Sequence, residues 1–243
     1  MKKAIVMMMA ASAVSVMAAS VDTDIGIYSK YIWRGMCLDD QPVAQGGITV
    51  THESGVYANV WGNYSLSDDY TGVDGLNEVD YTVGYSGTFD VIDYDLGYIY
   101  YSFPNTSLES TSEIYAGLAL NNLPITPSVY AYYDIDEADS LYVVADLNYG
   151  MDLSDALSAE VGASLAWADD NFNDFYYGGR SSSSLSDMTV YAGLSYALSD
   201  SLSLGASLTY SFFPDSAASD AAEATYANEE ENLFGGVSLA YSF

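Results

Sequence analysis

The chain has 243 residues, of which 34 are acidic and only five are basic, so its formal net charge is −29. This strong negative charge excludes nucleic acid as a partner, because the chain would repel the phosphate backbone. The 24 tyrosines and 20 glycines are far from the composition of an average soluble domain. The single cysteine, Cys37, has no second cysteine with which to form an internal disulfide.

The N-terminus has the sequence features of a secretory signal peptide, in the order in which they occur there. Lys2 and Lys3 precede an apolar run from Ala4 to Val16, and the small residues Ala18 and Ala19 follow. The alternative, a membrane anchor, would need about 20 apolar residues, which is longer than this run. The pattern therefore predicts export from the cytoplasm.

We place the cleaved leader at residues 1–19 and a single domain at residues 20–243. The leader removes two of the five basic residues and none of the acids, so the mature chain carries a net charge of −31. No later stretch is long and apolar enough for a membrane-spanning helix. Any further membrane crossing would therefore use strands, whose backbone groups bond to neighbouring strands.

Twelve segments of the mature chain place apolar residues at alternate positions. Successive side chains of a strand point to opposite faces, so each segment has an apolar face and a small or polar face. Each is about ten residues long, which is the length of a tilted strand that crosses a membrane. The segments are Asp24–Arg34, Ala44–His52, Gly55–Tyr64, Glu78–Tyr85, Val91–Tyr101, Glu113–Leu120, Ile125–Asp134, Leu141–Met151, Leu157–Trp167, Met188–Leu198, Leu202–Phe212 and Leu233–Phe243.

The connections between these segments alternate in length. Long, polar or acidic stretches such as Ala168–Asp187 and Phe213–Asn232 follow the odd segments, and short turns such as Glu53–Ser54 follow the even ones. Long loops at one end and tight turns at the other are typical of outer-membrane barrels. We therefore predict an all-β fold, a transmembrane antiparallel up-and-down β-barrel of about twelve strands, with ten or fourteen as alternatives. The last strand should pair with the first.

The aromatic residues support a membrane barrel. Tyrosine and tryptophan favour membrane interfaces, where an apolar ring and a polar tip are both accommodated. A soluble β-sandwich would also alternate, but it gives no reason for two aromatic girdles. The predicted outer girdle holds Trp33, Tyr64, Tyr100, Trp167 and Tyr210, and the predicted inner girdle holds Tyr85, Tyr149, Tyr196, Tyr241 and Phe243.

The first third of the chain resembles a known family. The residues that carry the likeness lie between positions 22 and 64, and include Ser29-Lys30-Tyr31-Ile32-Trp33-Arg34-Gly35, Pro42, Gln45-Gly46-Gly47, His52-Glu53-Ser54-Gly55, Tyr57 and Val60-Trp61-Gly62. They resemble the TorF-type porins of Gram-negative bacteria. The last strand also ends on an aromatic residue, Phe243, and in this it resembles the terminal strand of Gram-negative outer-membrane barrels. These likenesses imply a porin-like barrel in the outer membrane, delivered by periplasmic chaperones and the barrel-assembly machinery.

The inward-facing positions are polar and mostly acidic, as an aqueous channel requires. The candidate lumenal residues are Lys30, Arg34, Asp80, Asp95, Glu113, Asp146 and Glu160. One hypothesis places both cations on one wall, opposite the carboxylates, so that a transverse field crosses a narrow waist. The alternative pairs Arg34 with loop acids, either Asp39, Asp40 or Glu229–Glu231. The sequence does not decide between these two hypotheses.

Acidic clusters in the long connections suggest contact with the membrane surface. They are Asp68-Asp69 with Asp74, Asp134–Asp139, Asp169-Asp170 with Asp174, and Glu229–Glu231. Divalent cations could bridge such clusters to the phosphates of lipopolysaccharide. None has the spacing of an EF-hand, so we expect a solvated acidic surface, and we assign no metal ligands or cofactor.

These features predict a porin-like channel for passive diffusion of small hydrophilic solutes, with a preference for cations. The alternative is a closed structural or adhesive barrel that displays acidic loops without transport. We expect no enzyme, because a hydrolase would need a serine and histidine pair near the outer leaflet. The only histidine, His52, lies at a tight turn at the predicted periplasmic end. The sequence selects neither a solute nor an oligomeric state.

Overall fold

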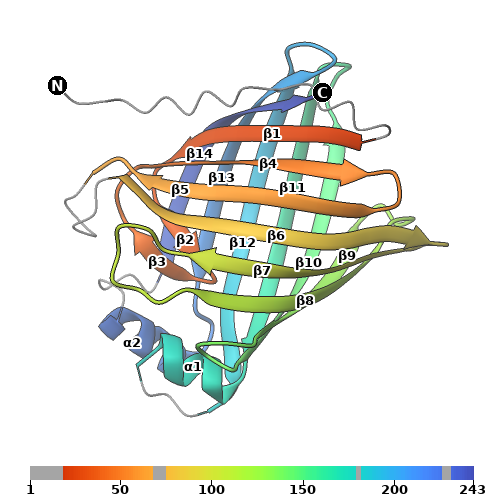
Figure 1. Cartoon of the computed structure of the whole chain (residues 1–243). Coiled ribbons are helices and arrows are strands. Elements are labelled where there is room, and N and C mark those ends of the chain that lie inside the picture. Colours follow the sequence, from red (N-terminus) through yellow and green to blue (C-terminus); the bar gives the residue numbers. More distant parts are fainter. Residues whose placement is uncertain (1–18, 68–74, 179–181, 226–230) are drawn as a thin grey trace.

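The computed structural model describes residues 19–67, 75–178, 182–225 and 231–243. Among these residues, twelve strands pair antiparallel into a closed barrel (Figure 1). The predicted all-β barrel of twelve strands is confirmed, and the alternatives of ten and fourteen are wrong. The barrel strands are β1 (Ala19–Tyr28), β4 (Val43–His52), β5 (Val56–Ser65), β6 (Gly75–Phe89), β7 (Ile92–Ser102), β8 (Thr111–Leu120), β9 (Thr126–Asp134), β10 (Leu141–Asp152), β11 (Leu157–Ala168), β12 (Ser184–Ala197), β13 (Leu202–Phe212) and β14 (Glu231–Ser242).

The barrel closes between its last strand and its first. β14 pairs antiparallel with β1 in a register that sets Ile25 opposite Leu239 and Tyr28 opposite Gly236. On its other side β1 pairs with β4. Every barrel strand therefore has two neighbours, and the closed sheet has no edge with unpaired backbone groups. The predicted pairing of the last strand with the first is confirmed.

The predicted first strand, Asp24–Arg34, has the wrong boundaries. β1 begins at Ala19 and ends at Tyr28, after which the chain turns into the barrel. Residues 31–33 form the first strand of a separate short hairpin. Its side chains alternate with the same period of two as those of β1, so the sequence pattern continues past the end of β1. Trp33 consequently lies inside the barrel, where its ring packs against Phe172. Its assignment to the outer girdle is wrong.

The two faces of the barrel differ in chemistry. Large apolar side chains such as Ile25 and Leu208 point outward and are 63% and 55% exposed. Glycine, serine, tyrosine and acidic residues point inward. The other nine girdle candidates also lie exposed on the outer face, namely Tyr64, Tyr85, Tyr100, Tyr149, Trp167, Tyr196, Tyr210, Tyr241 and Phe243. This is the arrangement expected of a barrel surrounded by lipid.

The two ends of the barrel also differ. Two helices, α1 (Asp170–Tyr176) and α2 (Ser216–Thr225), lie in long connections at one end, which we call the loop end (Figure 1). Short turns lie at the other end, which we call the turn end. The C-terminus lies at the turn end, where the Ser242 amide donates to the Ser201 carbonyl. Among the described residues, neither helix is long and apolar enough to cross a membrane.

Several sequence predictions fall in undescribed parts of the chain. The predicted leader lies outside the described residues except for Ala19, the first residue of β1. The same holds for three candidate acids of one long connection, Asp68, Asp69 and Asp74. The boundary between leader and domain therefore stays a prediction.

A charge placed on the outward face should destabilise the barrel in lipid. We expect Leu208→Arg to lower the free energy of unfolding by about 2–4 kcal/mol, the range for a cation near the bilayer centre. The matched control is Ser207→Arg, one residue earlier on the same strand and facing the lumen. Urea unfolding in phosphatidylcholine vesicles measures both. Equal losses in the two variants would contradict the assignment of the faces.

Candidate functional site

A short hairpin between β1 and β4 folds into the barrel. Its strands are β2 (Tyr31–Trp33) and β3 (Met36–Asp39), and we call residues Tyr31–Asp39 the lumenal hairpin. Its turn is Arg34-Gly35, and both residues have positive φ, 48° and 81°. Positive φ at both central residues is characteristic of the two-residue type I′ turn, in which glycine is favoured at the second position. The local sequence therefore places Arg34 at the tip.

The lumenal hairpin crosses the barrel. The hairpin follows β1 in the sequence, but its tip lies close to β7 on another part of the wall. The ring centroids of Trp33 and of Tyr101 on β7 are 6.4 Å apart. On another side of the tip, a Cβ atom added to Gly35 would approach the Asp187 Cβ of β12 to 2.7 Å. A glycine is therefore required here for space as well as for backbone conformation. The tip is held between distant parts of the wall.

Arg34 forms a bidentate ion pair with Glu113 of β8. Its Nη1 donates to Oε1 at 2.8 Å and its Nη2 donates to Oε2 at 2.7 Å. Both side chains are buried, with 8% and 2% of their surface exposed. The guanidinium also stacks within 4.4–4.8 Å of the ring centres of Trp33, Tyr132 and Tyr142. The ion pair joins the hairpin to the far wall of the barrel.

The surroundings of Arg34 favour its charged form. Burial alone would lower the pKa of Arg34, but the Glu113 carboxylate, together with Tyr101 and Tyr142, raises that pKa above its ordinary value. Tyr101 Oη donates to Glu113 Oε2 at 2.8 Å, so the carboxylate accepts from a third donor. Nearby, Tyr142 Oη donates to Asp187 Oδ1 at 2.8 Å. A buried ion pair needs such additional bonds to offset its loss of hydration.

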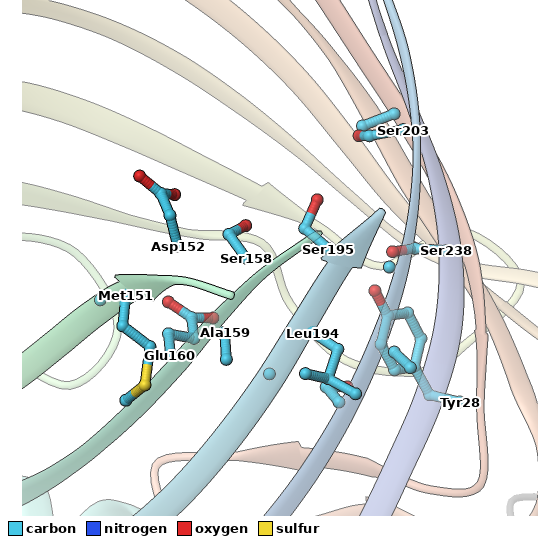
Figure 2. Close-up of a pocket in the computed structure, with 16 residues that line it drawn as sticks. Tyr28, Met151, Asp152, Ser158, Ala159, Glu160, Leu194, Ser195, Ser203 and Ser238 are labelled. Atoms are coloured by element: carbon cyan, nitrogen blue, oxygen red, sulfur yellow. The ribbon is translucent and has the colours of Figure 1, made fainter. Parts of the chain in front are cut away.

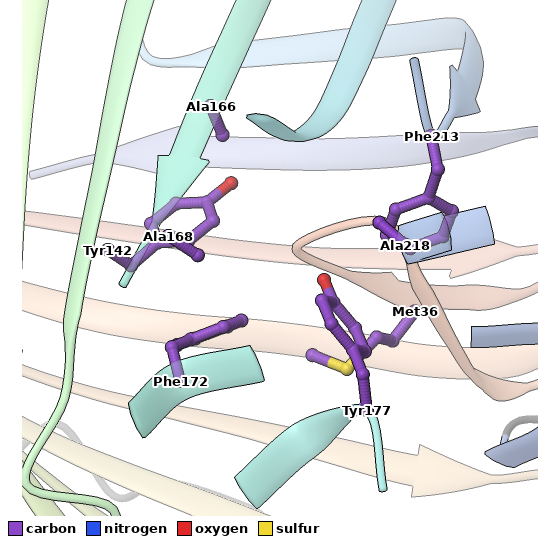
Figure 3. Close-up of a cluster of buried hydrophobic side chains, with 8 residues drawn as sticks. All are labelled: Met36, Tyr142, Ala166, Ala168, Phe172, Tyr177, Phe213 and Ala218. Carbon is purple, nitrogen blue, oxygen red and sulfur yellow. The ribbon is translucent and has the colours of Figure 1, made fainter. Parts of the chain in front are cut away.

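An apolar cluster lies inside the barrel at the loop end. Phe172 of α1 lies 5.3 Å from the ring of Tyr142, and Tyr177 lies 5.5 Å from the ring of Phe213. Asp169 caps α1, because its Oδ1 accepts from the Phe172 amide at 2.8 Å. Figure 3 shows the whole cluster, which consists of Met36, Tyr142, Ala166, Ala168, Phe172, Tyr177, Phe213 and Ala218. Together with the lumenal hairpin, this cluster constricts the loop end of the lumen.

The lumen is open and polar toward the turn end. One cavity of about 490 Å³ lies against a wall of small residues, with Tyr28 and Glu160 at its sides (Figure 2). A second cavity, of about 530 Å³, is lined by residues that include Thr49, Tyr57 and Asp95. The constriction therefore lies on the loop-end side of two polar cavities whose walls carry carboxylates.

The structure divides the seven predicted lumenal residues into two groups. Lys30, Arg34, Asp80 and Glu113 lie on or next to the lumenal hairpin, and Lys30 Nζ donates to Asn232 Oδ1 at 3.2 Å. Asp95, Asp146 and Glu160 lie nearer the turn end, where Tyr191 Oη donates to Asp146 Oδ1 at 3.1 Å.

Both hypotheses for Arg34 need correction. Arg34 does not lie on a wall with Lys30, because the hairpin carries it across the barrel. Its partner is the wall residue Glu113 and not a loop acid. Asp39 accepts from Ser65 Oγ, and Asp40 accepts from Gln41 Nε2. Two of the other suggested acids, Glu229 and Glu230, lie outside the described residues.

Two acids of the predicted clusters, Asp134 and Asp169, have structural roles. Asp134 Oδ2 accepts from Thr111 Oγ1 at 2.7 Å, and its Oδ1 accepts from the backbone amide of Asp136 at 2.9 Å. Asp169 caps a helix, as described above. Within residues 19–67, 75–178, 182–225 and 231–243, no group of three or more His, Cys, Asp or Glu side chains is placed to hold a metal ion.

Comparison with known proteins assigns the family. A family model described as "Bacterial protein of unknown function (Gcw_chp)" matches residues 10–184. The chain belongs to this family. No curated protein is a significant match.

Solved structures with the same fold are outer-membrane channels. A KdgM porin in complex with disordered oligogalacturonate has a TM-score of 0.58 at 10% identity, covering 92% of this chain and 99% of its own. The NanC porin has a TM-score of 0.55 at 10% identity, covering 91% and 98%. An outer-membrane channel from Pseudomonas putida F1 has a TM-score of 0.57 at 9% identity, covering 93% and 96%. At these identities the likeness establishes the fold of this member of the family.

Sequence reasoning missed three residues that shape the constriction, Tyr142, Asp187 and Phe172. Tyr142 is in phase with the inward residues of its strand, so its position could have been predicted. Phe172 and Tyr176 lie four residues apart after a capping aspartate, which is the pattern of a short amphipathic helix. Asp187 carries no local signal, because its role depends on a hairpin that arrives from the far side of the barrel.

Loss of one partner of the buried ion pair should destabilise the barrel. We expect Glu113→Ala to lower the free energy of unfolding by about 3–5 kcal/mol, since it leaves the Arg34 charge buried without a partner. The double variant Arg34→Met/Glu113→Leu should recover most of this loss. Urea unfolding of the wild type, Glu113→Ala and the double variant measures the three free energies. Glu53→Ala, an exposed change at a turn, is the control, and a double variant as unstable as Glu113→Ala would contradict the argument.

Proposed function

We propose that this protein is a porin-like channel of the outer membrane, through which small hydrophilic solutes diffuse passively with a preference for cations. The observation that carries the proposal is a closed barrel with an apolar outer face and a polar, acidic lumen. The fold it shares with outer-membrane channels supports this function, as does the similarity of residues 22–64 to the TorF-type porins.

The cation preference follows from the charges of the lumen. The part of the chain that the structure describes holds two basic residues, Arg34 and Lys30. The charge of Arg34 is neutralised by Glu113. Asp95, Asp146 and Glu160 lie nearer the turn end and add negative potential along the route. A lumen whose charges have one sign concentrates ions of the opposite sign and excludes ions of the same sign.

We further propose that the leader directs the chain to the periplasm, where chaperones and the barrel-assembly machinery insert it. The acidic loops would then meet lipopolysaccharide at the cell surface, with divalent cations between the like charges. Neither role requires catalytic chemistry of the barrel.

A closed structural or adhesive barrel is the alternative function. The observation that favours it is the apolar cluster at the loop end, where Phe172 and Tyr177 are buried against the wall. This barrel would display its loops without transport.

A planar-bilayer recording distinguishes the two functions. We expect steady conductance steps from the purified wild-type barrel, and larger steps from Arg34→Ala, because the hairpin then loses its ion pair to the far wall. Heat-modifiable migration on gels verifies folding of each protein. Silence from both correctly folded proteins would support the closed barrel and overturn the channel.

The lumenal carboxylates should set the ion preference. We expect the triple variant Asp95→Asn/Asp146→Asn/Glu160→Gln to move the reversal potential in a salt gradient toward zero, because the lumen loses three negative charges. Glu109→Gln, an exposed change in a loop, is the control. A reversal potential that is the same in the triple variant and the wild type would contradict a role of these acids in selectivity.

A further inference from the structure

Tyrosine rings cover glycines along the inner wall of the barrel. In five places a lumen-facing tyrosine stands directly opposite a glycine of the adjacent strand. The pairs are Tyr28 with Gly236, Tyr57 with Gly84, Tyr115 with Gly97, Tyr130 with Gly117, and Tyr191 with Gly162.

Each ring occupies the space that a side chain on its glycine would need. A Cβ added to Gly117 would approach the ring of Tyr130 to 2.1 Å, and a Cβ added to Gly97 would approach the ring of Tyr115 to 2.5 Å. Real Cβ atoms do not come so close to other atoms. The glycines therefore let the rings lie against the wall, where they take little width from the lumen.

Three of these lumenal tyrosines, Tyr57, Tyr115 and Tyr130, form one surface with Tyr132, and we call these four residues the tyrosine platform. The Tyr130 and Tyr132 rings lie 6.1 Å apart at an interplanar angle of 19°. Tyr115 lies 6.5 Å from Tyr130 and 5.6 Å from Tyr132, at 36° and 34°. The Tyr130 and Tyr132 rings are thus stacked and the Tyr115 ring is tilted against both, so three neighbouring rings form an aromatic cluster that Tyr57 joins through its hydroxyl.

Hydrogen-bonding groups border the tyrosine platform. Tyr57 Oη donates to Asp95 Oδ1 at 2.9 Å and also bonds the Tyr115 hydroxyl. The cavity of about 530 Å³ at this wall is lined by residues that include Thr49, Thr51, Tyr57, Thr88, Asp93, Asp95 and Tyr130. A cavity of this volume, with aromatic surface and a few convergent polar groups, has the properties of a small-molecule site.

The other side of the lumen leaves space opposite the platform. Gly193, Gly205, Ser207 and Ser238, on strands β12 to β14, line the cavity of about 490 Å³. Figure 2 shows Ser195, Ser203 and Ser238 along this wall, with Tyr28 beside Ser238. One side is thus aromatic and the other is made of small residues, so a flat, extended molecule can lie against the rings.

We propose that the tyrosine platform is a binding site for neutral linear oligosaccharides on their way through the channel. Sugar rings present C–H faces that stack on aromatic rings, and their hydroxyls donate to carboxylates such as Asp95 and Asp93. The acidic lumen repels anionic saccharides, which separates this site from a porin that holds oligogalacturonate. The proposal rests on the proposed channel function and names the class of solute that it carries.

Calorimetric titration of the purified barrel in detergent tests binding without requiring conduction. Maltohexaose is the neutral probe, and an oligogalacturonate of six sugars is the anionic control. We expect saturable binding of maltohexaose and none of the oligogalacturonate. Tyr130→Ala should weaken binding about tenfold, since loss of one stacked ring typically costs that much.

Matched variants distinguish stacking from packing. Tyr130→Phe keeps the ring and should bind as the wild type does. Tyr133→Ala lies on the outer face of the same strand and should also leave binding unchanged. Gly117→Val leaves the tyrosine in place but pushes its ring off the wall, and should weaken binding. Heat-modifiable migration verifies folding, and wild-type affinity in folded Tyr130→Ala and Gly117→Val would overturn the site.

Bilayer recordings separate this proposal from the channel function. Maltohexaose should interrupt the ion current of the wild type, and these interruptions should be shorter in Tyr130→Ala. Conductance without saccharide binding, or equal binding of oligogalacturonate, would overturn the saccharide site and leave the channel intact. Saccharide binding to a folded barrel that does not conduct would support the site and overturn the channel.

Discussion

Pairing of β1 with β14 is the interaction on which the rest of the structure depends. An open sheet would leave a row of amide and carbonyl groups without partners, which lipid cannot hydrate. Closure satisfies them and separates an apolar outside from a polar inside along every strand. The tyrosine-glycine pairs, the acidic cavities and the inserted hairpin all require that enclosed interior, because each lies on its inner side.

The period-two pattern was sufficient to predict the barrel, its strand number and the partner of the last strand, since each depends on local alternation and on loop length. It failed at Tyr28. The sequence from Tyr31 to Trp33 alternates as a membrane strand does, so nothing local separates a lumenal hairpin from a longer β1. The Arg34-Gly35 pair was the available sign, because a glycine after a polar residue between alternating segments favours a tight turn.

The candidate site was predictable in its composition and not in its contacts. The inward phase of Glu113 follows from the alternation of its own strand, so this residue could be predicted to face the lumen. Its pairing with Arg34 depends on how far the hairpin crosses the lumen, which no spacing in the sequence encodes. The same applies to Asp187, which lies against Gly35 only because the tip reaches that wall. Long-range contacts between buried charges are decided by tertiary geometry.

The attachment of the lumenal hairpin has a consequence for the order of assembly. Arg34 and Glu113 are 79 residues apart in sequence, and Glu113 lies on the strand that follows β7. The hairpin lies near the start of the barrel domain, yet its docking surface does not exist until the middle strands have formed. Contacts of such separation carry a large loop-closure cost and form late. The constriction is therefore completed by strands synthesised well after it, and a barrel interrupted before β8 has nothing to hold its hairpin inside.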